Sequence, residues 1–206
     1  ARIVQSCVCI FYSNTKNISV IRKGIRWNLD LNEGIDFSIF LLGYFERDTF
    51  IALERLINKG DTIIDIGANI GAHTLHMAQK VSTGGKVYAI EPTDYAFNKL
   101  TQNIKNNPKL YTQVKLRQIL LVDSENNMTD EIYSSWPLNN VQERHEVHLG
   151  IKKSIADAKK QKLDDFVAIE QIDRVDLIKL DVDGNELEVL AGGREVIKKY
   201  SPTFVM

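Results

Sequence analysis

The chain has 206 residues, which is enough for one well-filled hydrophobic core. Its residues are 44% hydrophobic and 26% charged with a formal net charge of −1, a balance that argues against a dedicated nucleic-acid binder, which usually carries a basic surplus. No apolar run approaches the roughly 20 residues that span a bilayer, and the start lacks a signal-peptide layout, so we expect a cytoplasmic protein without a membrane span.

Residues 1–43 are predicted to form a β-rich lead-in, and the fold is expected to begin with a β-hairpin and a helix before the sheet. Short β-like pieces alternate around Gly24 in a way typical of hairpins. Cys7 and Cys9 are two apart on an expected strand, too close for an unstrained disulfide and too few for a zinc site, so we expect them to pack. The chain begins without Met and stops at "SPTFVM" inside an expected strand, so we expect a fragment whose last strand leaves an open sheet edge for self-association.

From residue 44 to residue 206, segments with helical spacing alternate with short apolar runs, which indicates a second domain. The expected helices are 44–58, 70–81, 94–107 and 185–193, and the expected strands are 61–67, 86–91, 113–120, 175–181 and 202–206. This alternation predicts an α/β fold with a Rossmann-like, doubly wound, mostly parallel sheet that is covered on both faces. The lysine-rich run 151–162 is expected to be a solvated helix face.

The stretch "DIGANIGAHT", with Gly67 and Gly71, lies where the first expected strand leads into a helix. A phosphate-binding P-loop would need a lysine after the last glycine, so that site is excluded. A dinucleotide fingerprint has a glycine where Asn69 stands, so NAD is a disfavoured alternative. S-adenosylmethionine (SAM) has no pyrophosphate, and its carboxylate suits the amides that open the following helix. The turn therefore favours SAM.

Glu91 ends the second expected strand, in "YAIEP". A carboxylate at this place can accept hydrogen bonds from both ribose hydroxyls of an adenosine. NAD and SAM share that ribose, so Glu91 predicts a bound adenosine but does not distinguish the two cofactors. The spacing of Gly67 and Gly71 is what favours SAM over NAD.

Three longer stretches carry a family resemblance. "GDTIIDIGANIGAHTL", "VYAIEP" and "VDLIKLDVDGNELEVLAGG" resemble the FkbM-type SAM-dependent methyltransferases, a branch of the Rossmann-like methyltransferases. "WNLDL" and "LLGYFERDTF" are similar to the family's lead-in, so the resemblance runs from residue 27 to residue 206, with 124–160 poorly matched. The family usually has a glutamate where this chain has Asp183, and its fold continues past the fifth strand. The resemblance implies O-methylation of a hydroxyl on a sugar, a polyketide or another small molecule.

The turn and the resemblance together predict the residues of a cofactor site and of a catalytic group. The expected cofactor-binding residues are Asp65, Gly67, Ala68, Asn69, Gly71, Glu91, Asp123 and Asp181. An alcohol acceptor needs a group that removes its proton, and the catalytic candidates are Asp181, Lys179 and His145. His145 belongs to the segment 134–150, which is long enough to be a lid or an acceptor loop and also contains His148.

Several alternatives stay open at this point. His73 and His76 are expected to be packing or surface residues. We predict no resident metal, although a divalent cation with Asp181 as one ligand would suit a catechol-type variant. The protein could also be a non-catalytic SAM-binding module, and labelled SAM with a panel of metabolites would separate the two functions.

Overall fold

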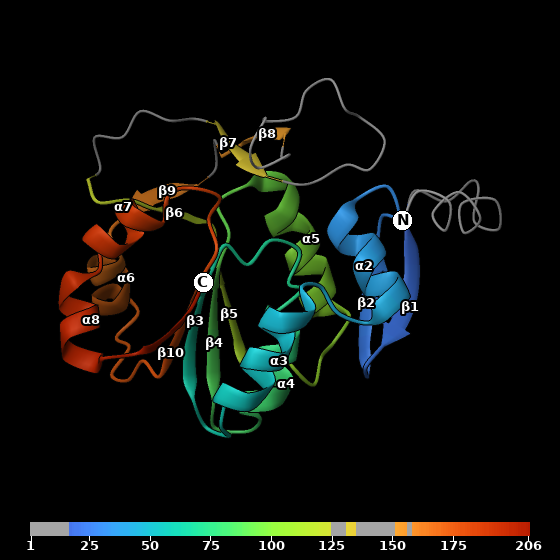
Figure 1. Ribbon diagram of the computed structural model, residues 1–206, viewed down its shortest axis with the longest axis horizontal. Helices are drawn as coiled ribbons and strands as arrows, with labels where there is room; N and C mark the ends of the chain where they lie inside the picture. The colour runs from blue at the N-terminus through green and yellow to red at the C-terminus, as the bar shows by residue number, and fades with distance from the viewer. Residues whose placement is uncertain (1–16, 125–130, 135–150, 156–157) are drawn as a thin grey trace.

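The computed structural model describes residues 17–124, 131–134, 151–155 and 158–206, and its centre is a five-stranded parallel sheet (Figure 1). The strands lie in the order β11 (Thr203–Val205), β10 (Leu177–Leu180), β3 (Thr62–Ile66), β4 (Lys86–Ile90) and β5 (Val114–Arg117). The chain runs outward from β3 to β5 and then crosses to β10 on the other side of β3. The predicted parallel α/β sheet is thereby confirmed, and its switch in strand order lies between β3 and β10, where such sheets bind ligands.

Successive side chains of the strands point to opposite faces of the sheet and divide the core in two. Ile63 and Val87 belong to the buried cluster on one face, and Ile64 and Ile178 belong to the cluster on the other. The helices of the first face are α3 (Arg47–Leu56), α4 (Thr74–Val81) and α5 (Asp94–Lys105). Those of the second are α6 (Leu163–Ile169), α7 (Glu186–Ala191) and α8 (Arg194–Tyr200) (Figure 1). Both faces are covered, as the apolar strands predict.

The lead-in is a hairpin followed by a helix. Strands β1 (Ile18–Arg22) and β2 (Ile25–Leu29) pair antiparallel across Lys23 and Gly24, which both have positive φ, as a tight hairpin turn requires. The prediction of hairpins through the first forty residues is wrong for α2 (Gly34–Leu42), because its apolar side chains fit a helical period as well as an alternating one. Cys7 and Cys9 lie outside the described residues.

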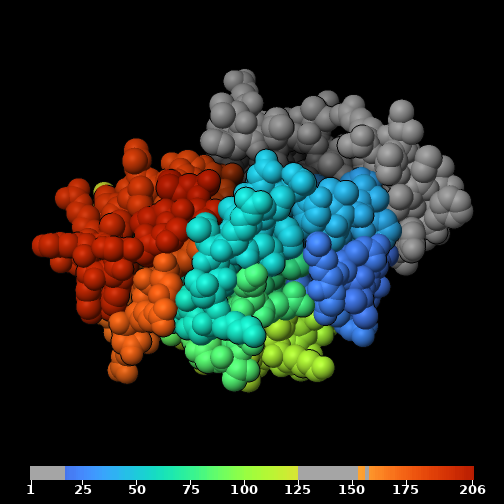
Figure 2. Space-filling model, turned by 60° about the horizontal axis from the view of Figure 1, so that its bottom comes forward, coloured from blue at the N-terminus to red at the C-terminus, as the bar shows by residue number. Residues whose placement is uncertain are grey.

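Asn103 of α5 and Asn107, which follows the end of α5, join the hairpin to the rest of the molecule. The amide of Asn28 donates to Oδ1 of Asn103 at 2.8 Å, and the amide of Arg26 donates to Oδ1 of Asn107 at 2.9 Å. Nδ2 of Asn107 donates to the Arg26 carbonyl at 2.7 Å, and Nδ2 of Asn103 donates to the Ile70 carbonyl at 3.0 Å. The lead-in shares the first buried cluster with α3, α4 and α5, and its blue surface adjoins the cyan surface that follows it along the chain (Figure 2). The division at residue 43 stays a prediction.

Two expected elements differ in the structure because segments far away in the sequence pair with them. The third expected strand, 113–120, splits into β5 and β6 (Ile119–Leu121), and β6 leaves the central sheet to pair with β9 (Lys159–Gln161). The helix expected at 151–162 is wrong, since this run contains β9 and also β8 (Ile151–Ser154), which pairs with β7 (Glu131–Ser134).

At the other edge of the sheet, β11 pairs with β10 and has no second neighbour among the described strands. Self-association through this edge stays a prediction. None of the helices in the described ranges has the length and apolar character needed to cross a membrane.

Candidate active site

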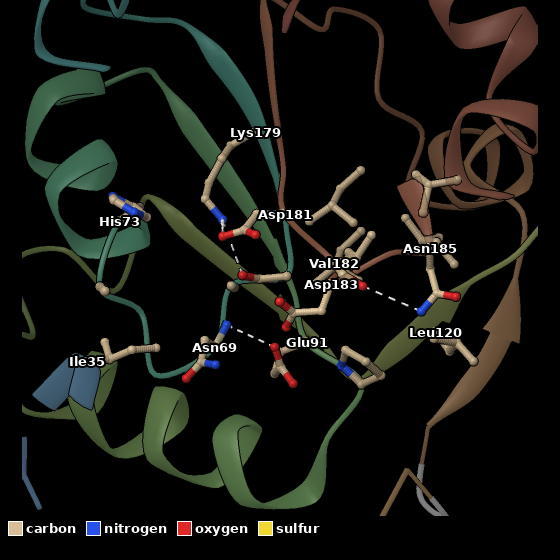
Figure 3. A pocket seen from close by; sticks show the side chains of 18 of the residues that line it. Ile35, Asn69, His73, Glu91, Leu120, Lys179, Asp181, Val182, Asp183 and Asn185 are labelled. Carbon is tan, nitrogen blue, oxygen red and sulfur yellow. Dashed lines mark hydrogen bonds and ion pairs between the residues drawn. The ribbon is translucent and has the colours of Figure 1, made fainter. Parts of the chain in front are cut away.

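A cavity of about 370 Å³ opens where β3, β4 and β10 end, the place at which the sequence predicts the ligand (Figure 3). Six of the predicted site residues line it: Gly67, Ala68, Asn69, Glu91, Lys179 and Asp181. Three others do not line it, namely Asp65, Gly71 and Asp123, of which Asp65 is fully buried and Asp123 is exposed. His145 and His148 lie outside the described residues. The structure thus brings most of the expected turn and both expected strand ends to one cavity.

Gly67 follows the end of β3 at a point where the backbone after β10 comes very close to it. Its φ is +79°, and a Cβ added there would lie 1.8 Å from the carbonyl oxygen of Asp181. The amides of Gly67 and Ala68 both donate to the carbonyl of Ile90 at 3.0 Å. These two amides are therefore engaged within the protein, and the glycine is needed for the approach of β10 to the turn.

Asn69 and Gly71 explain why the turn departs from a dinucleotide fingerprint. Asn69 has a φ of 49°, and its own Oδ1 accepts the amide of Ile70 at 2.8 Å, which stabilises a left-handed residue without glycine. Gly71 has a φ of +92°, and a Cβ there would lie 2.8 Å from Cδ1 of Leu100. The second glycine is thus favoured by its left-handed backbone, and Leu100 of α5 packs closely against it.

Glu91 is a buried carboxylate whose oxygens both accept hydrogen bonds. Oε2 accepts the amide of Asn69 at 2.9 Å, and Oε1 accepts the amide of Thr93 at 2.9 Å and also its hydroxyl. Burial raises the pKa of Glu91, although these bonds and the charge of Lys179 act in the opposite direction. These bonds join the glycine turn to the end of β4. Three of the roughly four acceptor sites of the carboxylate are used, so one site remains for a ligand.

Lys179 lines the cavity and lies among three acceptors, of which Asp181 is labelled in Figure 3. Its Nζ is 3.3 Å from Oδ2 of Asp181, 3.4 Å from the carbonyl of Gly67 and 3.7 Å from Oδ1 of Asp65, its register partner on β3. Burial by itself would lower the pKa of Lys179, but Asp65, Asp181 and Glu46 outweigh it and the pKa is raised. Lys179 therefore remains a cation and is unsuited to removing a proton.

Three residues whose place at the cavity the sequence did not predict also line it. Phe45 and Glu46 line the cavity from the segment before α3, and His73 lines it from the residue before α4. Nε2 of His73 lies 3.4 Å from Oε2 of Glu46, and the rings of His73 and Phe45 are 6.1 Å apart. The similarity of "YFERDTF" to the family's lead-in was the signal that pointed to this segment.

His76 lies one turn further along α4 and is a core residue, as expected. Its ring contacts Trp27 and Phe50, with centroids 6.0 Å and 5.0 Å away. Burial lowers the pKa of His76 to about 4, so the ring is neutral. Within the described ranges, no group of three or more His, Cys, Asp or Glu side chains is arranged to hold a metal ion.

Comparison with known proteins agrees with this geometry. A family model described as "Methyltransferase FkbM domain" matches residues 65–206, which is more than half of the chain. The chain belongs to the FkbM methyltransferase family. The matched range contains the glycine turn, Glu91, Lys179 and Asp181, whereas Phe45 and Glu46 precede it.

Two curated methyltransferases are similar in sequence to this chain. Hexuronic acid methyltransferase AglP of Haloferax volcanii is 31% identical over 147 residues, covering 71% of this chain and 56% of the relative. Methyltransferase 1 of Beauveria bassiana is 26% identical over 152 residues, covering 63% of this chain and 57% of the relative. The chain therefore spans a little over half the length of the curated relatives it matches.

Among solved structures, the methyltransferase FkbM from Methylobacillus flagellatus KT is 19% identical to this chain with a TM-score of 0.48. The match covers 72% of this chain and 32% of that one. The assignment to the FkbM family therefore rests on the family model.

Proposed function

We propose that this FkbM family member is a SAM-dependent methyltransferase that methylates a hydroxyl group on a sugar, a polyketide or another small molecule. The observation that carries the proposal is the buried carboxylate of Glu91, which is hydrogen-bonded to the glycine turn and lines a cavity at the switch point of a parallel sheet. A cytoplasmic location and a partner other than nucleic acid stay predictions from composition.

The residues of the cavity fit SAM. Glu91 offers a remaining acceptor site for a ribose hydroxyl, and the side chains of Ile90, Ile119 and Leu121 form an apolar wall beside it that suits an adenine. The left-handed turn residues give the backbone a close approach to the ligand. SAM supplies an electrophilic methyl group on a sulfonium, and the protein's task is to align the acceptor and exclude water, which can contribute roughly 7–11 kcal/mol.

Among the residues that the structure describes, Asp181 is the candidate for the general base that removes the proton of the acceptor hydroxyl. Its side chain is 46% exposed and lines the cavity, and Lys179 holds one of its oxygens at 3.3 Å. A carboxylate fixed in this way can orient an acceptor hydroxyl and receive its proton, typically a contribution of 10²–10⁴-fold. The proposed role of His145 lies outside the described residues and stays a prediction.

A non-catalytic SAM-binding module and an NAD-dependent enzyme are the competing functions. We expect titration calorimetry of the protein to detect SAM and its product S-adenosylhomocysteine at micromolar concentrations, and to detect no NAD, because Asn69 takes the place of the pyrophosphate glycine. Binding of NAD without SAM would refute the cofactor assignment. Transfer of label from SAM to a sugar or metabolite panel would then separate the enzyme from the module.

Replacing Glu91 with glutamine is expected to lower SAM affinity about ten- to a hundredfold. Glutamine keeps the shape but loses the charged acceptor, and hydrogen bonds to charged groups contribute about 1.5–3 kcal/mol, at 1.4 kcal/mol per decade of affinity. Calorimetry measures the change, and Glu54→Gln on α3, which lies outside the cavity lining, is the control. An unchanged dissociation constant in Glu91→Gln would place the ribose elsewhere.

A further inference from the structure

Glu46 reaches the cavity from an unusual backbone position. It precedes α3 with a φ of 44° and a ψ of 85°, a left-handed conformation that residues other than glycine rarely adopt. Such conformations persist only where the surrounding structure holds them, and they cluster at functional sites. The chain therefore keeps this side chain at the cavity wall against its local backbone preference.

His73 anchors the Glu46 carboxylate. Its Nε2 is 3.4 Å from Oε2 of Glu46, while its Nδ1 is buried and has no hydrogen-bond partner within the described residues. The side chain of His73 is only 5% exposed, and Glu46 is the described side chain that its Nε2 contacts. From this geometry we infer that His73 positions the carboxylate of Glu46.

The Glu46 carboxylate is suited to binding a positive charge. Its side chain is 42% exposed, and the hydrogen bond from His73 lowers its pKa, so it is ionised near neutral pH and a poor proton acceptor there. The neighbouring cation, Lys179, is 3% exposed and already contacts Asp65 and Asp181. Glu46 thus presents negative charge to the cavity.

The two ends of the cavity give a bound SAM its direction. Glu91 marks the ribose end, and His73 and Glu91 lie apart with Asn69 between them (Figure 3). A ligand with its ribose at Glu91 that extends along the turn brings its other end to His73 and Glu46. In SAM and S-adenosylhomocysteine this end is an amino acid, whose ammonium requires an anionic partner.

We propose that Glu46, positioned by His73, binds the α-ammonium of the cofactor's amino-acid end. The inference rests on the proposed SAM-dependent function and adds a cofactor residue from the segment just before α3, outside the range that the family model matches. A carboxylate held by a second side chain also distinguishes SAM from nucleosides that lack the amino acid.

The test compares two ligands that differ in this end. S-adenosylhomocysteine carries the ammonium and the carboxylate, whereas 5′-methylthioadenosine carries neither. We expect Glu46→Gln to weaken S-adenosylhomocysteine about ten- to a hundredfold by calorimetry and to leave 5′-methylthioadenosine unchanged. His73→Gln should weaken S-adenosylhomocysteine selectively and by less. Glu54→Gln, with a similarly exposed carboxylate on α3 that pairs with Lys80, should change neither affinity.

Unchanged binding of 5′-methylthioadenosine also shows that the variant is folded. Equal losses for both ligands in Glu46→Gln would mean a structural role and would overturn the inference. So would an unchanged affinity for S-adenosylhomocysteine combined with a higher KM for the acceptor, which would move Glu46 to the acceptor side. If the wild-type protein bound neither ligand, the proposed function itself would fail.

Discussion

Replacing Gly67 with alanine is expected to destabilise the protein by about 4 kcal/mol or more, a large part of the roughly 5–15 kcal/mol that stabilises an ordinary domain. Alanine at a φ of +79° is strained by about 1–2 kcal/mol, and its Cβ would lie 1.8 Å from the backbone oxygen of Asp181. That oxygen belongs to the end of β10, so the clash is relieved only by moving one strand end away from another. Urea unfolding followed by circular dichroism measures the loss.

Gly84→Ala is the matched control. Gly84 has a φ of +95°, and a Cβ added there meets nothing within 4 Å, so this variant reports backbone strain alone. We expect a loss of about 1–2 kcal/mol for it. If Gly67→Ala were as stable as Gly84→Ala, the ends of β3 and β10 would be able to move apart freely. The close approach of Gly67 to the Asp181 carbonyl would then not limit which residue can stand at position 67.

Replacing Lys179 with methionine is expected to destabilise the protein by about 3–5 kcal/mol. Methionine nearly keeps the volume, but it removes the positive charge beside Asp65, whose carboxylate is fully buried and has one oxygen without a hydrogen-bond partner among the described residues. Breaking a buried ion pair on one side leaves an uncompensated charge, which is more destabilising than removing both partners. Denaturant unfolding of Lys179→Met gives the magnitude.

The double variant Asp65→Asn/Lys179→Met provides the check. With both charges absent, most of the lost stability should return, since asparagine can still accept from the hydroxyl of Thr74. A double variant as unstable as Lys179→Met would show that the lysine acts through its contacts with Asp181 and Gly67 and not through the charge of Asp65.

The sequence predicts the parts of this fold that depend on local pattern. The central strands are nearly continuous apolar runs, and the glycine turn and Glu91 follow directly from two of them, so their meeting at one edge of a parallel sheet is a matter of geometry. The buried pair of Asp65 and Lys179 was anticipated only as two separate site residues. Their pairing depends on the register between β3 and β10.

The elements that sequence reasoning missed depend on distant partners. The run 113–120 reads as one strand, and its division after Arg117 follows from the pairing of β6 with β9, some forty residues later. Glu46 and His73 belong to different segments, and each by itself resembles a surface or packing residue. Their contact exists because the segment before α3 packs on the start of α4, which no local pattern in either segment encodes.

Asn103 and Asn107, at and just after the end of α5, suggest how the lead-in could vary. Asn103 and Asn107 bind main-chain atoms of Arg26, Asn28 and Ile70, so these bonds require a strand at that position but no particular side chains on it. Other sequences could therefore occupy the lead-in while the joint on α5 stays the same. Because the lead-in is followed by Phe45 and Glu46, exchange of this segment would remodel one wall of the cavity and leave the glycine turn intact, which offers a route to new ligand preferences by recombination.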